Sequence, residues 1–409
     1  MRRKLRWAAA AAAAAPAQAA SAGAAAGWRI ERAFAGPDAP TLWPIAASGA
    51  DNAWLLELPS GPGGPDFVTQ RWNGSQWVPV ALPARLPGSG SAEPGYGIYT
   101  TAPGDTWFFP ELGGIPYALR WTGSGWTISQ VSAGPDTVVG AAVFSSTDVW
   151  ALGQAISSAL LAWHWNGTVW QAVPAPPHMP VSVDGVAPGD IWALGDPPVT
   201  TDVFVMHWNG TAWSAPRLPA FPPVRAGYPW EPAAITAAGP RDAWVALTPR
   251  ESPAAAPGPV AGGLILLHWN GSAWRTVAET RALGDVTGLT PDGRGGFWLT
   301  TTDPANPEAG DIVDYRDGTL TSRAAPAPPG YTGTTSGIVA VPGTGSFWAV
   351  GTMREDSGDN YETDILLYTN GTVGYCNPPN APVRASESSH KSLLFLDALV
   401  ESPSAASTF

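Results

Sequence analysis

The chain has 409 residues, of which 44% are hydrophobic and only 13% charged, so it has ample material for a core and is not generally disordered. Its net charge of −12 excludes a nucleic-acid backbone as partner, because phosphate binding depends on lysine and arginine. Cys376 is the only cysteine, which excludes an intramolecular disulfide and a paired-cysteine metal site.

The first 26 residues predict an export signal. A basic start, Arg2 to Lys4, precedes a short apolar run, Ala8 to Ala15, and small residues follow where a signal peptidase cuts. We expect cleavage near residues 19–26. The signal therefore predicts that the protein is secreted or extracellular. Association with the cell envelope is the alternative. The apolar run is too short to span a membrane, and no later segment predicts a span.

The next part of the chain repeats a first motif that ends in tryptophan. In most copies an acidic or amide residue lies two positions before the tryptophan, as in Asp148-Val-Trp150. The tryptophans recur at intervals of 42 to 54 residues, at Trp54, Trp107, Trp150, Trp192, Trp244, Trp298 and Trp348. Such spacing is typical of the four-stranded blade of a β-propeller.

A second motif follows each first motif and ends in another tryptophan. It reads His164-Trp-Asn-Gly-Thr-Val-Trp170 in the third repeat. Arginine replaces the histidine at Arg71 and Arg120, and degenerate copies begin at Tyr315 and Tyr368. Each repeat therefore reads as four antiparallel strands, a to d, with the second motif joining c to d. Its Asn-Gly predicts a two-residue hairpin turn, which requires positive φ.

The two ends of the repeat region predict a closed ring. The seventh repeat has Gly374 where its second tryptophan belongs, whereas Trp28 begins a strand d that has no blade of its own. We therefore expect an all-β, seven-bladed β-propeller over residues 27–375, with four-stranded antiparallel blades and an N-terminal closing strand that removes an exposed sheet edge. Residues 376–409 do not continue the repeat and are expected to be loosely ordered.

The repeated side chains have structural explanations. Large aromatic residues at fixed positions are expected to fill the wedges between blades. Histidines at equivalent positions of different blades cannot converge on one metal ion, so we expect hydrogen-bonding roles for them. The repeated acids are expected to bond their own turn backbone. The Asn-x-Ser/Thr sequons coincide with the hairpins, and turn chemistry explains them better than glycosylation does.

Loop lengths single out one face of the expected ring. The a–b and c–d turns are short, whereas the b–c and d–a connections vary in length and emerge on the opposite face, the variable-loop face. Variable loops on a rigid frame commonly carry binding sites. The long connections are expected at 81–97, 216–233, 249–263, 302–311 and 353–363. The expected ligand-binding residues are Tyr96, Arg225, Tyr228, Trp230, Glu231 and Arg250.

Acidic residues gather in the b–c connections of the sixth and seventh repeats. Calcium binds six to eight oxygen atoms, so these carboxylates are candidate ligands, although their spacing does not match an EF-hand. A solvated acidic rim is the alternative interpretation. The candidate calcium ligands are Asp356, Asp359, Glu362 and Asp364. No other cofactor is expected.

Together the two motifs resemble the tryptophan-rich repeat propellers of secreted bacterial proteins and, more distantly, kelch, sialidase-type and lectin propellers. The resemblance covers residues 27–375 and implies an architecture without a function. No nucleophile elbow, phosphate-binding loop or zinc-protease motif is present. We therefore expect a monomeric binding or interaction module, for a glycan or an extracellular protein, without catalysis. The alternatives are a glycoside hydrolase or lyase that uses loop carboxylates, and a structural cell-surface protein.

Overall fold

In the computed structural model, the described residues form antiparallel sheets and contain no helix. They are residues 27–34, 40–58, 67–83, 86–87, 92–93, 95, 97–195, 203–222, 229–249, 262–304, 306–357 and 362–369. The expected leader, 1–26, and the expected tail, 376–409, lie outside this part of the chain. Because no helix is present in the described residues, none there is long and apolar enough to cross a membrane.

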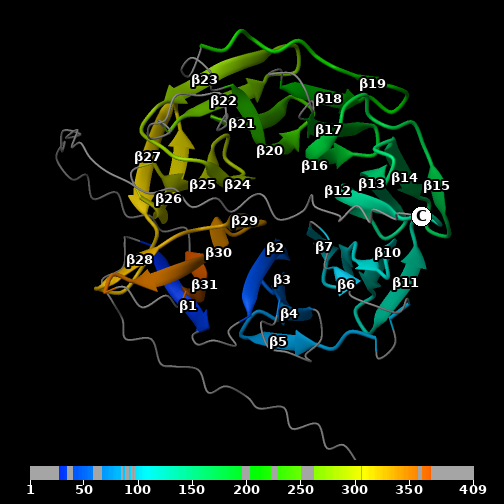
Figure 1. Ribbon diagram of the computed structural model, residues 1–409, viewed down its shortest axis with the longest axis horizontal. Coiled ribbons are helices and arrows are strands. Elements are labelled where there is room, and N and C mark those ends of the chain that lie inside the picture. Colours follow the sequence, from blue (N-terminus) through cyan, green and yellow to red (C-terminus); the bar gives the residue numbers. More distant parts are fainter. Residues whose placement is uncertain are drawn as a thin grey trace, which may run out of the picture. The chain divides into compact units, whose positions relative to one another are not determined.

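Seven sheets follow one another around a ring, and each sheet is one blade, with strands a to d numbered from the inside outward (Figure 1). Blade 1 contains β2 (Thr41–Gly49), β3 (Asn52–Leu58), β4 (Val68–Trp72) and β5 (Trp77–Val80). Blade 2 contains β7 (Ile98–Ala102), β8 (Asp105–Phe108), β10 (Ile115–Trp121) and β11 (Trp126–Gln130), with the short strands β6 (Ala92–Glu93) and β9 (Glu111–Leu112). Blade 3 contains β12 (Asp136–Ser145), β13 (Asp148–Ala155), β14 (Leu160–Trp165) and β15 (Trp170–Ala172).

The remaining four blades repeat this order of strands. Blade 4 contains β16 (Pro180–Ala187), β17 (Asp190–Gly195), β18 (Phe204–Trp208) and β19 (Trp213–Ser214). Blade 5 contains β20 (Trp230–Gly239), β21 (Asp242–Pro249), β22 (Leu264–Trp269) and β23 (Trp274–Thr280). Blade 6 contains β24 (Val286–Pro291), β25 (Phe297–Asp303), β26 (Asn306–Arg316) and β27 (Thr319–Ala324). Blade 7 contains β29 (Gly337–Val341), β30 (Ser346–Glu355), β31 (Glu362–Thr369) and β1 (Trp28–Phe34), with the short strand β28 (Tyr331–Gly333).

Strand β1 closes the ring, as predicted. It pairs antiparallel with β31, with Trp28 opposite Thr369 and Phe34 opposite Asp364, so segments from far apart in the sequence share one sheet (Figure 1). A hydrophobic cluster then joins blade 7 to blade 1, and clusters of the same kind join every other neighbouring pair of blades. The prediction of seven four-stranded blades is confirmed.

Tryptophans fill the wedges between blades. The b-strand Trp192 of blade 4 is fully buried, and its ring centroid lies 5.4 Å from those of both Trp269 and Trp274 in blade 5. The closing strand supplies the equivalent ring in blade 7, where Trp28 lies 6.1 Å from Trp298 of blade 6. Three further interfaces repeat the arrangement, with Trp54 against Trp121 and Trp126, Trp107 against Trp165 and Trp170, and Trp348 against Trp72 and Trp77.

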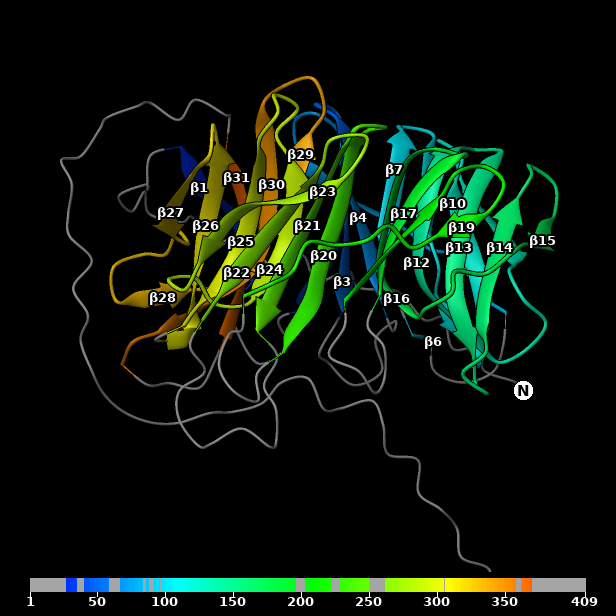
Figure 2. The same ribbon diagram turned by 90° about the horizontal axis from the view of Figure 1, so that it is seen from above.

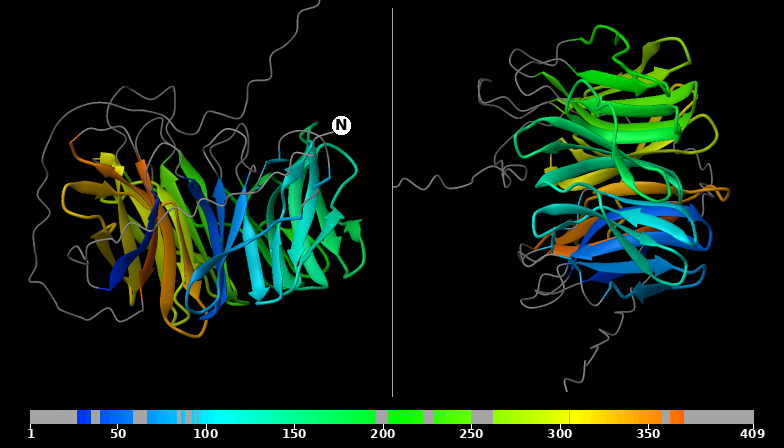
Figure 3. Two further views of the ribbon diagram at one scale, coloured as in Figure 1. Left: turned by 90° about the horizontal axis from the view of Figure 1, so that it is seen from below. Right: turned by 90° about the vertical axis from the view of Figure 1, so that its right-hand side faces the viewer.

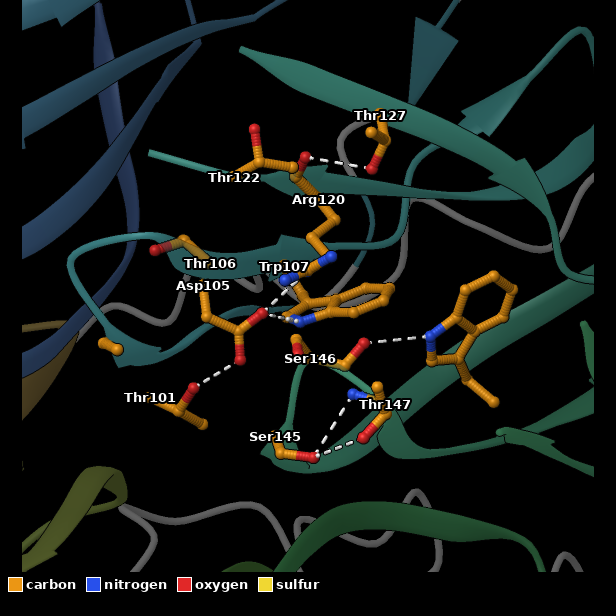
Figure 4. A network of polar contacts seen from close by, with 12 residues as sticks. Thr101, Asp105, Thr106, Trp107, Arg120, Thr122, Thr127, Ser145, Ser146 and Thr147 are labelled. Atoms are coloured by element: carbon orange, nitrogen blue, oxygen red, sulfur yellow. Dashed lines mark hydrogen bonds and ion pairs between the residues drawn. The ribbon is translucent and has the colours of Figure 1, made fainter. Parts of the chain in front are cut away.

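The repeated acids bind side chains, whereas the sequence predicted bonds to their own turn backbone. In blade 2, Asp105 Oδ1 accepts hydrogen bonds from the Trp107 indole at 2.9 Å and from Arg120 Nε at 2.8 Å (Figure 4). The carboxylate thereby fixes the strand-c side chain that lies against the indole. Histidine replaces the arginine in three blades, in the pairs His164–Asp148, His207–Asp190 and His268–Asp242 at 2.9, 2.7 and 3.0 Å. The histidines thus have the hydrogen-bonding role that was predicted.

Most c–d hairpins carry four-residue loops, so the predicted two-residue turn is wrong for them. In blade 3, Trp165 pairs with Trp170, and Gly167 between them has a φ of +94°. Asn166 keeps negative φ and instead caps the loop: its Oδ1 accepts the amides of Thr168 and Val169 at 3.0 Å and the Thr168 hydroxyl at 2.8 Å. The third residue of the sequon therefore serves the turn. The same cap recurs at Asn73, Asn209 and Asn270.

Blade 6 departs from the motif by one residue. The b-strand tryptophan of blade 5, Trp244, pairs with His268, but that of blade 6, Trp298, pairs with Asp314. Asp314 thus takes the histidine position, which the sequence assigned to Tyr315. Tyr315 instead takes the first-tryptophan position, because it is the residue that follows Asp314 along the strand.

The hairpin of blade 6 is also closed differently from the others. Its two central residues, Asp317 and Gly318, both have positive φ, +50° and +81°, as a type I′ turn requires. The two-residue turn expected everywhere is therefore found at this degenerate copy. Leu320 pairs with Tyr315, at the position where other blades carry their second tryptophan.

The strands of all blades run between two faces (Figures 2 and 3). The face that carries the a–b and c–d turns is called the short-turn face. On the variable-loop face, the b–c connection of blade 5 spans 250–263, whereas that of blade 6 is only 304–305. The long loop expected over 302–311 is therefore wrong, since Thr302 pairs with Gly310 and the strands continue. Thr300, Thr301 and Thr302 are β-branched and favour this extension.

Candidate functional site

The structure describes two of the six residues expected to bind a ligand. Trp230 begins β20, is 7% exposed and donates its indole N–H to the Pro222 carbonyl at 2.8 Å. It packs in the core between blades 4 and 5, so its ring stabilises the start of the inner strand. Glu231 is half-buried beside it. The others, Tyr96, Arg225, Tyr228 and Arg250, lie outside the described residues.

The candidate calcium ligands do not form one described cluster. Asp356 is exposed and accepts a hydrogen bond from the Thr332 hydroxyl at 2.7 Å. Asp364 is buried, accepts the Leu42 amide at 3.2 Å and pairs with Thr352, roughly 13 Å of extended strand away from Asp356. Asp359 lies outside the described residues, as does the side chain of Glu362. Among the described residues no group of three or more candidate ligands could hold a metal ion. The calcium site stays a prediction.

Two titratable side chains of the inner strands tie neighbouring blades together. Tyr99 Oη accepts the amide of Ala141 at 3.1 Å, and Asp184 Oδ2 accepts the amide of Ala237 at 2.9 Å. Burial raises the pKa of Tyr99 to about 12 and also raises the pKa of Asp184. Because both groups are occupied by the backbone of the next blade, we assign them to the scaffold.

A buried carboxylate lies where blade 7 meets blade 1. Glu57 is 7% exposed, accepts a hydrogen bond from Gln70 Nε2 at 3.2 Å, and interacts with the charge of Arg32 on the closing strand. Burial raises the pKa of Glu57, although Gln70 and Arg32 act in the opposite direction. Within the described residues, Glu57 Oε1 and Gln70 Oε1 are buried without a hydrogen-bond partner.

Replacing Glu57 by glutamine is expected to stabilise the protein at neutral pH. A carboxyl whose pKa is raised on folding contributes stability below its unfolded pKa and loses it as pH rises through the folded value. Glutamine cannot ionise, and its amide can donate to Gln70 Oε1, which is worth about 1 kcal/mol. Urea denaturation should give a higher free energy of unfolding for Glu57→Gln than for the wild type at pH 7. Near pH 4 the two values should be equal. A gain that grows on acidification would contradict this account.

The described residues form a groove of about 450 Å³ between blades 5 and 6, on the short-turn face. Two turns rim it, the a–b turn of blade 5 at Arg241 and the Asp317–Gly318 turn of blade 6. Gly271 helps to place one rim residue: its φ is +92°, and a Cβ there would lie 2.5 Å from Arg241 Cγ. The aromatic and polar lining residues are Arg241, Asp242, Trp244, His268, Tyr315 and Asp317.

The groove opens because blade 6 lacks the usual pair of tryptophans. At the preceding interface, Trp269 and Trp274 both pack against Trp192. Here Tyr315 and Leu320 occupy the two corresponding positions, and both are smaller than tryptophan. The side chain of Asp242 is 36% exposed, and those of the equivalent Asp148 and Asp190 are 29% and 14% exposed.

The groove combines aromatic surface with hydrogen-bonding groups. Asp242 Oδ1 accepts the Trp244 indole N–H at 2.6 Å and lies 3.0 Å from His268 Nε2, whose ring stacks on Trp244 at 4.1 Å. That leaves Asp242 Oδ2, the Asp317 carboxylate and the Arg241 guanidinium at the exposed rim. Such a site offers acceptors, a cationic donor and ring edges to a small polar ligand. The sequence signal for it was the degenerate second motif of the sixth repeat.

No protein-family model matches the chain, and no curated protein matches it either. Solved structures do match. A polysaccharide lyase of family PL25, an ulvan lyase, gives a TM-score of 0.54 at 12% identity, covering 83% of this chain and 94% of its own. A GH74 enzyme of Niastella koreensis gives 0.52 at 12% identity, covering 81% of this chain and 54% of its own.

A third match is the fucose-specific lectin of Aleuria aurantia, with a TM-score of 0.45 at 11% identity over 73% of this chain and 99% of its own. At 12% identity, the likeness to the lyase and to the GH74 enzyme shows a shared fold and assigns no function. The chain is therefore a seven-bladed β-propeller whose function must be argued from its own site.

Proposed function

We propose that the protein is an exported, non-catalytic carbohydrate-binding propeller, and that it belongs with the tryptophan-rich repeat propellers its motifs resemble. The observation that supports carbohydrate binding is the groove between blades 5 and 6. A sugar ring presents C–H faces and hydroxyl groups together, so it needs both aromatic surface and hydrogen-bonding groups. His268, whose side chain is 28% exposed and lies over the buried Trp244, supplies the aromatic surface, and Arg241, Asp242 and Asp317 supply the hydrogen-bonding groups.

The histidine–carboxylate pair in the groove is better explained by packing than by catalysis. The pair lines the groove, yet equivalent pairs occur in blades 3 and 4, where the histidine rings lie against Trp150 and Trp192. A pair that the scaffold repeats is explained by packing, and a reaction at one site does not require three copies. The competing proposal is a hydrolase or lyase that uses Asp242 and Asp317 as its two carboxylates.

The variable-loop face is a second proposed binding surface, for a glycan or an extracellular protein. It rests on connections of unequal length carried by a rigid ring, such as 250–263 against 304–305. Its expected residues lie largely outside the described chain, so it does not carry the proposal.

Filling the groove with a tryptophan is expected to abolish carbohydrate binding. Leu320 packs against the hydrophobic cluster that contains the lining residues Trp244 and Tyr315. Leu320→Trp restores the residue type that blades 1 to 5 carry at this position, so we expect its larger ring to extend into the groove. The mature protein and the variant should be compared on a glycan array and with a panel of chromogenic glycosides. We expect wild-type binding without turnover, and at least a ~100-fold loss in Leu320→Trp, about 2.7 kcal/mol of binding free energy.

Leu320→Met is the matched control, because it keeps side-chain volume and should leave the groove open. The melting temperature of each variant separates a filled groove from a failed fold. Equal glycan binding by wild type and Leu320→Trp would place the site elsewhere. Turnover that Asp317→Asn removes would establish the enzyme instead.

A further inference from the structure

The charges around the groove are unequal. Two carboxylates, Asp242 and Asp317, line it, against the single guanidinium of Arg241. Both hydrogen bonds that Asp242 receives from its neighbours go to Oδ1, and they come from the indole of Trp244 and the imidazole of His268. Asp317 is exposed, and no ion pair within the described residues includes it. The rim therefore presents net negative charge.

The whole chain adds to this local field. Its net charge is −12, with 33 acidic and 21 basic residues, so an approaching anion is repelled before it reaches the groove. A neutral sugar meets no such penalty. Its hydroxyls donate hydrogen bonds, and carboxylates are strong acceptors for them. Two neighbouring hydroxyls can share one carboxylate, since each carboxylate has two oxygens.

We propose that the groove selects a neutral sugar with vicinal hydroxyls and rejects sugars that carry carboxylate or sulfate. Asp317 is the specificity-determining residue, because its carboxylate is the more exposed of the two and stands on the two-residue turn at the rim. Asp242 accepts hydroxyls through Oδ2. The inference rests on the proposed function, since it concerns the same groove.

Matched sugars that differ only in charge test this selectivity. The mature protein is titrated with a neutral oligosaccharide found on the array and with its uronate and sulfate derivatives. We expect the neutral ligand to bind at least ~10-fold more tightly, about 1.4 kcal/mol. Salt should reduce the difference, because the Debye length falls from about 30 Å at 0.01 M to about 3 Å at 1 M. Affinity for the neutral sugar should change little with salt.

Asp317→Asn and Asp317→Lys complete the test. Both should weaken binding of the neutral sugar, and the lysine variant should also lose the discrimination against anionic ligands. Groove-dependent binding that favours the anionic sugar, or that Asp317→Lys leaves unchanged, would overturn the selectivity while the proposed function stands. Binding that Leu320→Trp does not affect would defeat both.

Discussion

Removing residues 27–34 is expected to unfold the ring rather than merely shorten it. These residues form β1, whose pairing with β31 supplies the outer strand of blade 7. Its loss would expose the edge of β31 and uncover Trp298, which packs against Trp28. Trp28 is 2% exposed, so Trp28→Ala alone should lower the free energy of unfolding by about 3–5 kcal/mol.

Thermal and urea denaturation followed by tryptophan fluorescence measure this effect. A chain that begins at residue 27 is the matched control, because it lacks the expected leader but keeps β1, and it should melt cooperatively. A chain that begins at residue 35 should show no cooperative transition, or one at much lower temperature. Equal melting of the two chains would show that closure by β1 does not stabilise the propeller.

Trp192→Ala is expected to destabilise the protein far more than Trp213→Ala. Trp192 is fully buried between blades 4 and 5, with its ring against His207, Trp269 and Trp274. Truncating such a side chain leaves a cavity and costs about 3–5 kcal/mol. Trp213 is only half-buried and packs at the interface of blades 3 and 4. Its truncation should cost less than half as much.

Chemical denaturation of both variants under one set of conditions compares these free energies. Trp192→Phe serves as an intermediate, because it keeps an aromatic ring while removing part of the volume. Similar losses for Trp192→Ala and Trp213→Ala would mean that strand-d rings carry as much of the packing as strand-b rings. The claim that the strand-b tryptophans dominate the packing between blades would then be wrong.

The architecture could be predicted from the sequence because the same tryptophan motifs recur in each repeat, and each copy independently indicates one blade. The tryptophan spacing and the unpaired Trp28 led to seven blades and to closure by β1, and both were confirmed. The hairpin type did not follow, because Asn-Gly fits a two-residue turn as well as a four-residue loop. The pairing of Trp165 with Trp170 distinguishes them, and that register is seen only in the structure.

The candidate groove could not be predicted from the sequence either, because it also depends on strand register. The degenerate motif at Tyr315 was visible, but its register against Trp298 was not, and only that register places Tyr315 and Leu320 in the tryptophan positions. For Trp230 the sequence suggested a functional role that the structure does not support. Its place at the end of a long connection suggested a binding role, whereas its burial shows a packing one.

The most direct test of carbohydrate binding at the groove uses the three repeated histidines as probes. His164, His207 and His268 each lie beside a carboxylate and against a tryptophan, but only His268 lines the groove. Ring resonances of all three can be followed by NMR while a neutral sugar from the glycan array is added. The account predicts saturable shifts at His268 and none at His164 or His207. Saturable binding that leaves His268 unmoved, or that moves all three alike, would contradict it.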